Sequence, residues 1–215
     1  MMLRSLILVA GLLSAAPTFA ADGAARSWEA GRDYALVEPP QPTGTGDKIE
    51  VLEVFSYACP HCAHFQPYAE KLKAALPKNA EFTLMPADFQ PRWVMFARGF
   101  YAAKALGLVE KTHQAMFDAI YRDNLPLDGM DAVAGFYAGH GADKATFLST
   151  ADSFVVDGDL DRIRAREIAY GIDSTPTIIV NGKFRVVADS DKNIGYDDML
   201  DIVQYLVAQE AKKKR

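Results

Sequence analysis

The chain has few cysteines, no excess of positive charge and almost no long apolar runs. Two cysteines in 215 residues are too few for a four-cysteine zinc or iron–sulfur site, or for a small domain held together by disulfides. A formal net charge of −5 argues against nucleic acid as the main partner. Eleven prolines and fifteen glycines are ordinary numbers, which excludes a collagen-like or low-complexity chain. What remains is a globular protein long enough to bury a sizeable core.

The one markedly apolar stretch lies at the N-terminus. Arg4 precedes an apolar run over residues 6–16, and Thr18-Phe19-Ala20 supplies a small-x-small cleavage motif. A run this short is typical of a secretory signal peptide, an uncleaved anchor being the alternative. We therefore expect residues 1–20 to be removed and the mature protein to be exported and soluble. Two neighbouring cysteines in an oxidising compartment are normally a disulfide.

The first part of the mature chain predicts a β-α-β unit. Residues 21–48 are rich in proline and small polar side chains and predict a loose N-terminal arm, with a short edge strand at 34–37. Residues 49–57 form a nearly continuous β-branched and aromatic run, typical of a strand buried on both faces. Apolar residues at helical spacing over residues 65–76 predict an amphipathic helix, and residues 82–85 a second strand. This order indicates a parallel sheet.

The pattern then becomes helical before strands return. Five segments predict helices: residues 93–106, 109–121, 129–138, 143–149 and 152–170. Strands follow at 177–180 and 184–187, on either side of an Asn-Gly hairpin signal, and a last amphipathic helix includes residues 199–207. The expected fold class is α/β, with residues 49–91 and 171–215 forming one domain and residues 92–170 an all-helical insertion.

Cys59-Pro60-His61-Cys62 directly follows the first long strand and begins the next helix. Free N–H groups at a helix start favour the Cys59 thiolate, and Pro60 fits a first turn that does not need its N–H. A helix dipole contributing ~2 kcal/mol lowers a thiol pKa of about 8.5 only to about 7. His61 could supply the further positive charge. Cys59 is therefore the candidate nucleophile and Cys62 the resolving thiol, and a stabilised thiolate would make their disulfide an oxidant.

Other uses of this pair have less support. A disulfide that closes a four-residue loop stabilises a fold by only about 2 kcal/mol. A zinc site would need His113 and His140 to join the cysteines, without ligand spacing to support it, and His113 is expected to be a core histidine. A c-type haem needs a histidine directly after the second cysteine, where Ala63 stands. We expect no metal.

The cysteine motif and the strand before it, Val51-Leu52-Glu53-Val54-Phe55-Ser56-Tyr57, resemble those of the periplasmic thiol:disulfide oxidoreductases of the DsbA family. The likeness continues through Phe147-Leu148-Ser149, Thr175-Pro176-Thr177 and Val180-Asn181-Gly182-Lys183-Phe184. It implies a thioredoxin fold interrupted by a helical domain, a periplasmic location and no cofactor besides the cysteine pair. It also implies unfolded exported proteins with cysteines as substrates, and a quinone-linked membrane oxidase of the DsbB type as the partner that restores the disulfide. We expect a monomer.

The resemblance gives roles to three more residues. It implies that Pro176 is cis and packs beside the cysteines, and that the backbone of Thr175 pairs with an extended substrate; an ordinary trans proline at a strand start is the alternative. Glu53 matches an acidic residue that helps to move the proton of the buried cysteine. Its carboxyl should be desolvated, with a raised pKa, unless it lies on a solvated strand edge. Relatives often carry a lysine on the neighbouring strand, and residues 82–85 contain none.

The sequence thus predicts an exported enzyme that donates the Cys59–Cys62 disulfide to newly exported proteins, through a mixed disulfide at Cys59. One alternative is a periplasmic disulfide isomerase or reductase with the same chemistry. Isomerases of this superfamily carry an N-terminal dimerisation domain, for which the short arm at residues 21–48 leaves no room. The other alternative is a secreted binding protein with a structural disulfide, and the reduction potential would separate all three.

Overall fold

The computed structural model describes residues 27–213, so the predicted signal peptide and the first residues of the arm lie outside the described part. Within that part the strands form one sheet in the order β1-β5-β4-β2-β3. The strands are β1 (Ala35–Leu36), β2 (Ile49–Phe55), β3 (Ala80–Pro86), β4 (Thr177–Val180) and β5 (Phe184–Val187). β2 and β3 are parallel, and the other neighbouring strands are antiparallel. The predicted strands are confirmed, β4 and β5 to the residue.

The predicted helices are also present. They are α1 (Pro60–Ala75), α2 (Pro91–Ala105), α3 (Val109–Tyr121), α4 (Met130–Gly139), α5 (Lys144–Ala151), α6 (Phe154–Tyr170) and α7 (Tyr196–Lys213). Several helices begin or end a few residues away from the limits of the apolar pattern, because capping residues fix where a helix begins and ends. At the start of α6 the Ser153 hydroxyl accepts a hydrogen bond from the Val156 N–H, and Gly171 ends the helix in the left-handed conformation. None of the described helices is long and apolar enough to span a membrane.

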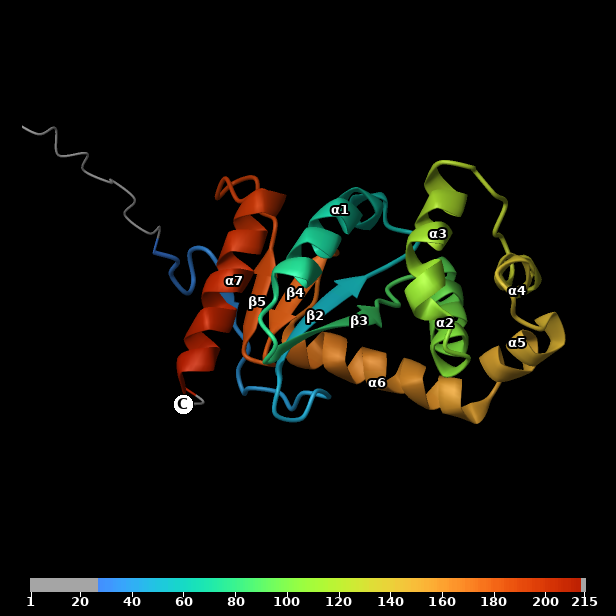
Figure 1. The fold of residues 1–215 in the computed structure, drawn as a ribbon, viewed down its shortest axis with the longest axis horizontal. Coiled ribbons are helices and arrows are strands. Elements are labelled where there is room, and N and C mark those ends of the chain that lie inside the picture. The colour runs from blue at the N-terminus through green and yellow to red at the C-terminus, as the bar shows by residue number, and fades with distance from the viewer. Residues whose placement is uncertain (1–26, 214–215) are drawn as a thin grey trace, which may run out of the picture.

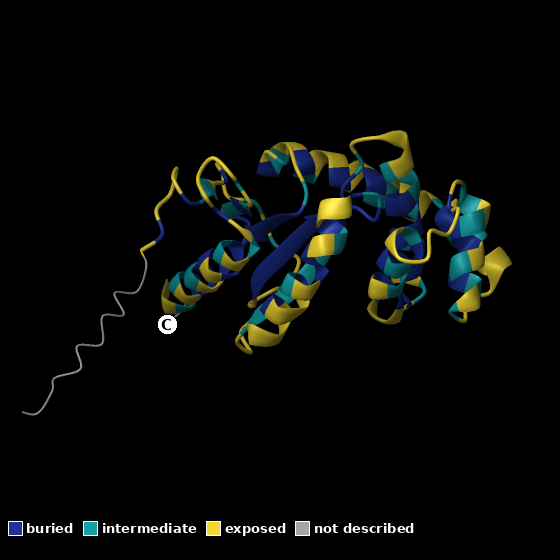
Figure 2. Cartoon of the chain, turned by 90° about the horizontal axis from the view of Figure 1, so that it is seen from above, coloured by how far each residue is buried: buried dark blue, intermediate teal, exposed yellow. Residues whose placement is uncertain are grey.

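β2 lies at the centre of the molecule, and all seven of its residues are buried. Its side chains alternate between two faces: Ile49 and Val51 pack against α1 and α7, whereas Leu52 and Val54 pack against α6. Figure 1 shows these layers, and Figure 2 shows the buried strands between helices whose outer faces are exposed. Cover on both faces explains the unbroken apolar run in the sequence.

Helices α2 to α5 form a helical unit at one end of the sheet, and α6 runs back from it to the strands (Figure 1). Leu160 and Ile163 of α6 pack on the sheet, so this helix joins the helical unit to the strands. The core of the unit is aromatic. Phe100 and Phe117 contact Phe55 at the end of β2, which places the residues after β2 at the junction of the two parts.

The described part of the N-terminal arm is fixed to the sheet, so the prediction of a loose arm is wrong for these residues. Trp28 and Val37 are buried, and β1 pairs with β5. The Gln41 N–H donates to the carbonyl of Gly182 in the β4–β5 turn. Gly182 has a φ of +65°, and a Cβ there would lie 2.0 Å from the Gln41 carbonyl oxygen. Glycine is therefore needed both for the turn and for the docking of the arm.

The C-terminal helix is tied to the β4–β5 turn by a buried carboxylate. Glu210 is 1% exposed and accepts hydrogen bonds from Asn181 Nδ2 at 2.7 Å, Lys213 Nζ at 2.9 Å and Lys183 Nζ. Burial opposes ionisation of this carboxyl, but these three donors outweigh it and lower the pKa of Glu210 to about 2. The ionised carboxylate therefore stabilises the packing of α7 on the hairpin.

We expect Glu210→Gln to lower the free energy of unfolding by about 3 kcal/mol at pH 7. The reason is that a carboxyl whose pKa is lower in the folded than in the unfolded protein stabilises the fold when it is ionised. That stability is fully present above the ordinary carboxyl pKa and is lost as the pH falls toward 2. The difference between wild type and variant, measured by urea unfolding, should therefore shrink between about pH 4.5 and pH 2. Asp201→Asn, an exposed change on the same helix, is the control; an equal loss in both variants would contradict the role of Glu210.

Candidate active site

The cysteine motif lies where β2 passes into α1. Cys59 is the N-cap of α1 and Pro60 stands in its first turn, as the sequence predicts. The loop before them is held by the Cys59 N–H, which donates to the Ser56 carbonyl at 3.0 Å, and by the Ser56 hydroxyl, which accepts from the Ala58 N–H at 3.1 Å. Cys62 follows one turn into the helix. The sequence therefore folds locally so that the first sulfur stands at the open end of the helix.

Both cysteines are free thiols in this structure, and both are largely covered. Cys59 is 5% exposed and Cys62 is 0% exposed. Cys62 lies in the aromatic core formed where β2 meets the helical unit. Cys62 is the more deeply buried of the two, as predicted. Cys59 is also buried, however, whereas the sequence analysis expected it to be the accessible nucleophile.

The loop before β4 brings a distant segment to the cysteines. The Thr175–Pro176 peptide bond is cis, as the resemblance implied, and the trans alternative is wrong. The Cys59 sulfur lies 3.5 Å from the Thr175 carbonyl oxygen, to which the thiol donates, although 116 positions separate the two residues in the chain. The antiparallel pairing of β4 with β2 explains this approach, because Thr177 is the partner of Val54 near the end of β2.

The two sulfurs have opposite acid–base character. The Cys62 thiol and the backbone N–H groups of Cys62 and His61 favour the Cys59 thiolate and outweigh its burial, which lowers the pKa of Cys59 to about 5. Burial raises the pKa of Cys62 well above that of an ordinary thiol. At neutral pH the reduced site therefore holds one thiolate, on Cys59, and one neutral thiol.

His61 contributes to this balance through its backbone. Its side chain is exposed, its N–H is among the groups that lower the pKa of Cys59, and its carbonyl accepts a hydrogen bond from the Tyr196 hydroxyl at 3.3 Å. The donors that act on Cys59 do not include the imidazole. The charge that the sequence analysis gave to the His61 side chain stays a prediction.

Glu53 is fully enclosed within the sheet. It is 0% exposed and lies between Leu84 of β3 and Ile178 of β4 in the strand register, so the solvated-edge alternative is wrong. Within residues 27–213 neither carboxylate oxygen has a hydrogen-bond partner. Burial, and then the charge of Glu70, raise the pKa of Glu53 to about 8. Glu53 in turn is one of the groups that raise the pKa of Cys62, so the two side chains interact electrostatically.

Two aromatic residues that the sequence analysis did not single out also belong to this region. Tyr57 is buried, and its hydroxyl lies 3.0 Å from Nδ1 of His113, which confirms His113 as a core histidine; burial lowers the pKa of His113 to about 3. Tyr121, at the end of α3, is 38% exposed. Burial and then the charges of Cys59 and Cys62 raise the pKa of Tyr121 to about 12. The sequence carries no signal for these contacts, because they join segments far apart in the chain.

The histidines considered for a zinc site lie elsewhere. His113 is bonded to Tyr57, and Nδ1 of His140 lies 2.8 Å from the Phe136 carbonyl oxygen. Among the described residues, no group of three or more His, Cys, Asp or Glu side chains could hold a metal ion.

Comparison with known proteins agrees with this geometry. A thioredoxin family model matches residues 47–204. The thiol:disulfide interchange protein DsbA of Pseudomonas aeruginosa is 34% identical over 208 residues, which cover 97% of each chain. DsbA of Azotobacter vinelandii is 37% identical over 180 residues, 84% of this chain and 83% of the relative. The crystal structure of the oxidoreductase DsbA from Xylella fastidiosa superposes with a TM-score of 0.80 and 37% identity, covering 86% of this chain and 98% of that one.

We expect the Cys59 thiolate, followed by its absorbance at 240 nm in the reduced protein, to titrate with a midpoint of about 5. Cys62→Ala should raise the midpoint more than His61→Ala, because the Cys62 thiol is the strongest donor to Cys59 whereas His61 acts through a backbone N–H that the substitution keeps. The reverse order of the two variants would show that the imidazole charge dominates.

We expect the Glu53 carboxyl to titrate near pH 8, because it is enclosed and unpaired. The measurement is NMR of protein labelled with ¹³C at the glutamate side-chain carboxyl, with Glu53→Gln assigning the signal. A midpoint near 4 would contradict this environment.

Proposed function

The chain belongs to the DsbA family of thiol:disulfide oxidoreductases, and from that premise we propose that Cys59 and Cys62 are its redox-active pair. The enzyme has the thioredoxin fold and donates a disulfide to substrate proteins. The observation that carries the residue assignment is the unequal pair of sulfurs: a thiolate at the start of α1 and a buried neutral thiol one turn later.

The proposed reaction begins with the disulfide form. A substrate thiolate attacks the Cys59 sulfur, a substrate–Cys59 bond forms, and the Cys59–Cys62 bond breaks with its electron pair on Cys62. A second substrate thiolate then attacks the substrate sulfur of the mixed disulfide, and Cys59 leaves as a thiolate. The substrate gains a disulfide and loses two electrons, which the enzyme keeps as one thiolate and one thiol. Stabilisation of Cys59 as a thiolate favours this last departure.

Glu53 is the proposed proton donor for Cys62. The buried Cys62 sulfur, with its raised pKa, takes up a proton when the disulfide opens. At pH 7 a carboxyl with a pKa of about 8 is still mostly protonated and can supply one. The Glu53 carboxylate left behind is then reprotonated from solvent.

The low pKa of Cys59 also sets the direction of the reaction. At pH 7, a thiol with a pKa of about 5 rather than 9 stabilises the reduced form by about 2.7 kcal/mol, which raises the reduction potential by roughly 60 mV. A reduced form that is stabilised makes the disulfide a better oxidant. This favours a disulfide donor over the isomerase, the reductase or a binding protein with a structural disulfide.

Substrates and partners follow from the same site. The backbone at Thr175, beside the cis proline, is the proposed pairing edge for an extended substrate, which would give affinity without sequence selectivity. The proposed substrates are unfolded exported proteins with cysteines, and a quinone-linked membrane oxidase of the DsbB type restores the disulfide. The proposed location is the periplasm, where the enzyme acts as a monomer with no cofactor besides its cysteine pair.

Trapping of the mixed disulfide tests the assignment of the two sulfurs. With Cys62→Ala, a substrate peptide that carries an activated disulfide should remain bound to Cys59, because no second enzyme thiol can release it. With Cys59→Ala the same peptide should react far more slowly, since Cys62 is buried and neutral. Mass spectrometry of the adducts gives the result, and equal labelling of both variants would contradict the assignment. In the wild type, a reduction potential below about −300 mV would instead indicate a structural disulfide.

A further inference from the structure

A cavity of about 740 Å³ lies at the outer edge of β3, away from the cysteine loop. β3 is an edge strand with β2 as its neighbour in the sheet, and the cavity reaches residues on both of its faces, between α1, α2 and α3. Leu84, Phe100 and Val109 give it apolar walls. Its volume is in the range of pockets that hold small organic molecules.

Three residues that line this cavity carry buried polar atoms without hydrogen-bond partners. Both carboxylate oxygens of Glu53, Nε2 of His113 and Oγ1 of Thr83 have no hydrogen-bond partner within residues 27–213, and all three residues line the cavity. Buried polar groups are normally bonded to protein, water or a ligand. Three such groups on one cavity therefore point to a polar occupant.

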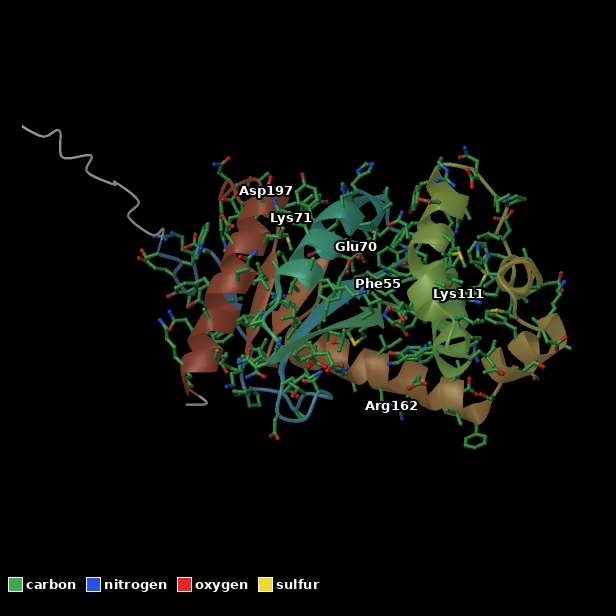
Figure 3. The ribbon with its side chains drawn as sticks, viewed as in Figure 1. Phe55, Glu70, Lys71, Lys111, Arg162 and Asp197 are labelled. Atoms are coloured by element: carbon green, nitrogen blue, oxygen red, sulfur yellow. The ribbon has the colours of Figure 1, made fainter. Side chains whose placement is uncertain are left out.

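The charges around the cavity favour a cation. The acidic side chains that line it are Glu50, Glu53, Glu70, Glu81 and Glu110, and the basic ones are Lys73, Lys104 and Arg166. Two of these acids are already paired: Glu50 with Arg166 at 3.3 Å, and Glu81 with Lys48 at 2.9 Å. Burial and Glu70 are the main influences on Glu53, and both raise its pKa. Figure 3 shows Glu70 on the side of α1 that looks toward α3. Glu53 is thus a buried acid with a second acid nearby.

The other titratable groups around Glu53 do not supply a positive charge. His113 is held neutral by burial, which lowers its pKa to about 3. Cys62 and Tyr57, on the side of the cysteine loop, interact with Glu53 as further acidic groups. Lys73 and Lys104 are exposed, and neither is among the groups that lower the pKa of Glu53.

From this arrangement we infer that the cavity binds a small organic cation, a protonated amine or an amidinium on an apolar body, with its charge at Glu53. The apolar body would pack on Leu84, Phe100 and Val109, and the cationic N–H groups would satisfy both carboxylate oxygens of Glu53. The Glu53 carboxyl must lose its proton to accept the cation, so each bound cation releases one proton to solvent from the protonated form. This inference does not rest on the redox roles proposed above, but a bound cation would remove the proton that Glu53 is proposed to give to Cys62.

Benzamidine and benzamide, which share a shape but differ in charge, are the probes for this site. NMR titrations of the isotope-labelled oxidised protein, in which no thiol titrates, give the dissociation constants. We expect benzamidine to bind at least 10-fold more tightly than benzamide at pH 9. Its affinity should rise roughly 50- to 100-fold between pH 6 and pH 9, because the ionised fraction of a carboxyl with a pKa of about 8 rises by that factor. Equal binding of the two probes, or an affinity that does not change with pH, would overturn the proposal.

Two pairs of variants locate the binding. Glu53→Gln should remove the preference for benzamidine, whereas Glu110→Gln, a change at an exposed residue of the same cavity, should keep most of it. Leu84 is the register partner of Glu53, so Leu84→Lys should place an internal ammonium beside the carboxyl and weaken benzamidine binding at least 10-fold. Leu84→Met should stay within about 3-fold of wild type. Unchanged binding in both Glu53→Gln and Leu84→Lys would show that the cation does not bind at Glu53.

Discussion

The start of α1 holds two sulfurs, and their environments differ in how well they stabilise a negative charge. The Cys62 thiol and the backbone N–H groups of Cys62 and His61, in the first turn of the helix, favour a negative charge on the sulfur of Cys59, whereas apolar and aromatic side chains enclose Cys62. A thiolate is stabilised in the first environment and excluded from the second. If the two sulfurs form the proposed redox-active disulfide, it is an oxidant because its reduction leaves the negative charge on Cys59, where the thiolate is stabilised. The position of the helix start relative to the end of β2 therefore decides the chemistry.

The sheet supports this arrangement from both sides. β2 carries Glu53 and leads into the cysteine loop, and β4 begins beside the end of β2, so that Thr175 and the cis Pro176 approach Cys59. A buried carboxyl without partners works against folding when it is ionised. Glu53 avoids most of this cost by remaining protonated at neutral pH, as its pKa of about 8 indicates. The same burial that would destabilise an ionised carboxylate thus keeps a proton on Glu53, which is the proton that we propose passes to Cys62.

Local patterns in the sequence were enough to predict the parts of the molecule that depend on neighbouring residues. The apolar run before Cys59, the Asn-Gly hairpin and the helical spacing gave the strands and helices, and the start of α1 followed from Pro60. The docking of the arm was missed because backbone hydrogen bonds, such as that between Gln41 and Gly182, leave no apolar periodicity. The contact of Tyr57 with His113 and the cavity beside β3 were missed because both depend on how α1, α2 and α3 pack around the sheet.

Glu53 links the cysteine pair to the cavity, and its charge state depends on what stands opposite it. The resemblance to the DsbA family suggested a lysine on the neighbouring strand, but the register partner on β3 is Leu84, and burial and Glu70 instead hold the proton on the carboxyl. An ion pair would keep Glu53 ionised at neutral pH and ready to accept a proton from Cys62, whereas a neutral Glu53 is ready to give one. In the proposed reaction the enzyme gives up its disulfide by accepting electrons and a proton at Cys62. A neutral Glu53 therefore suits the proposed reaction in the direction of disulfide donation.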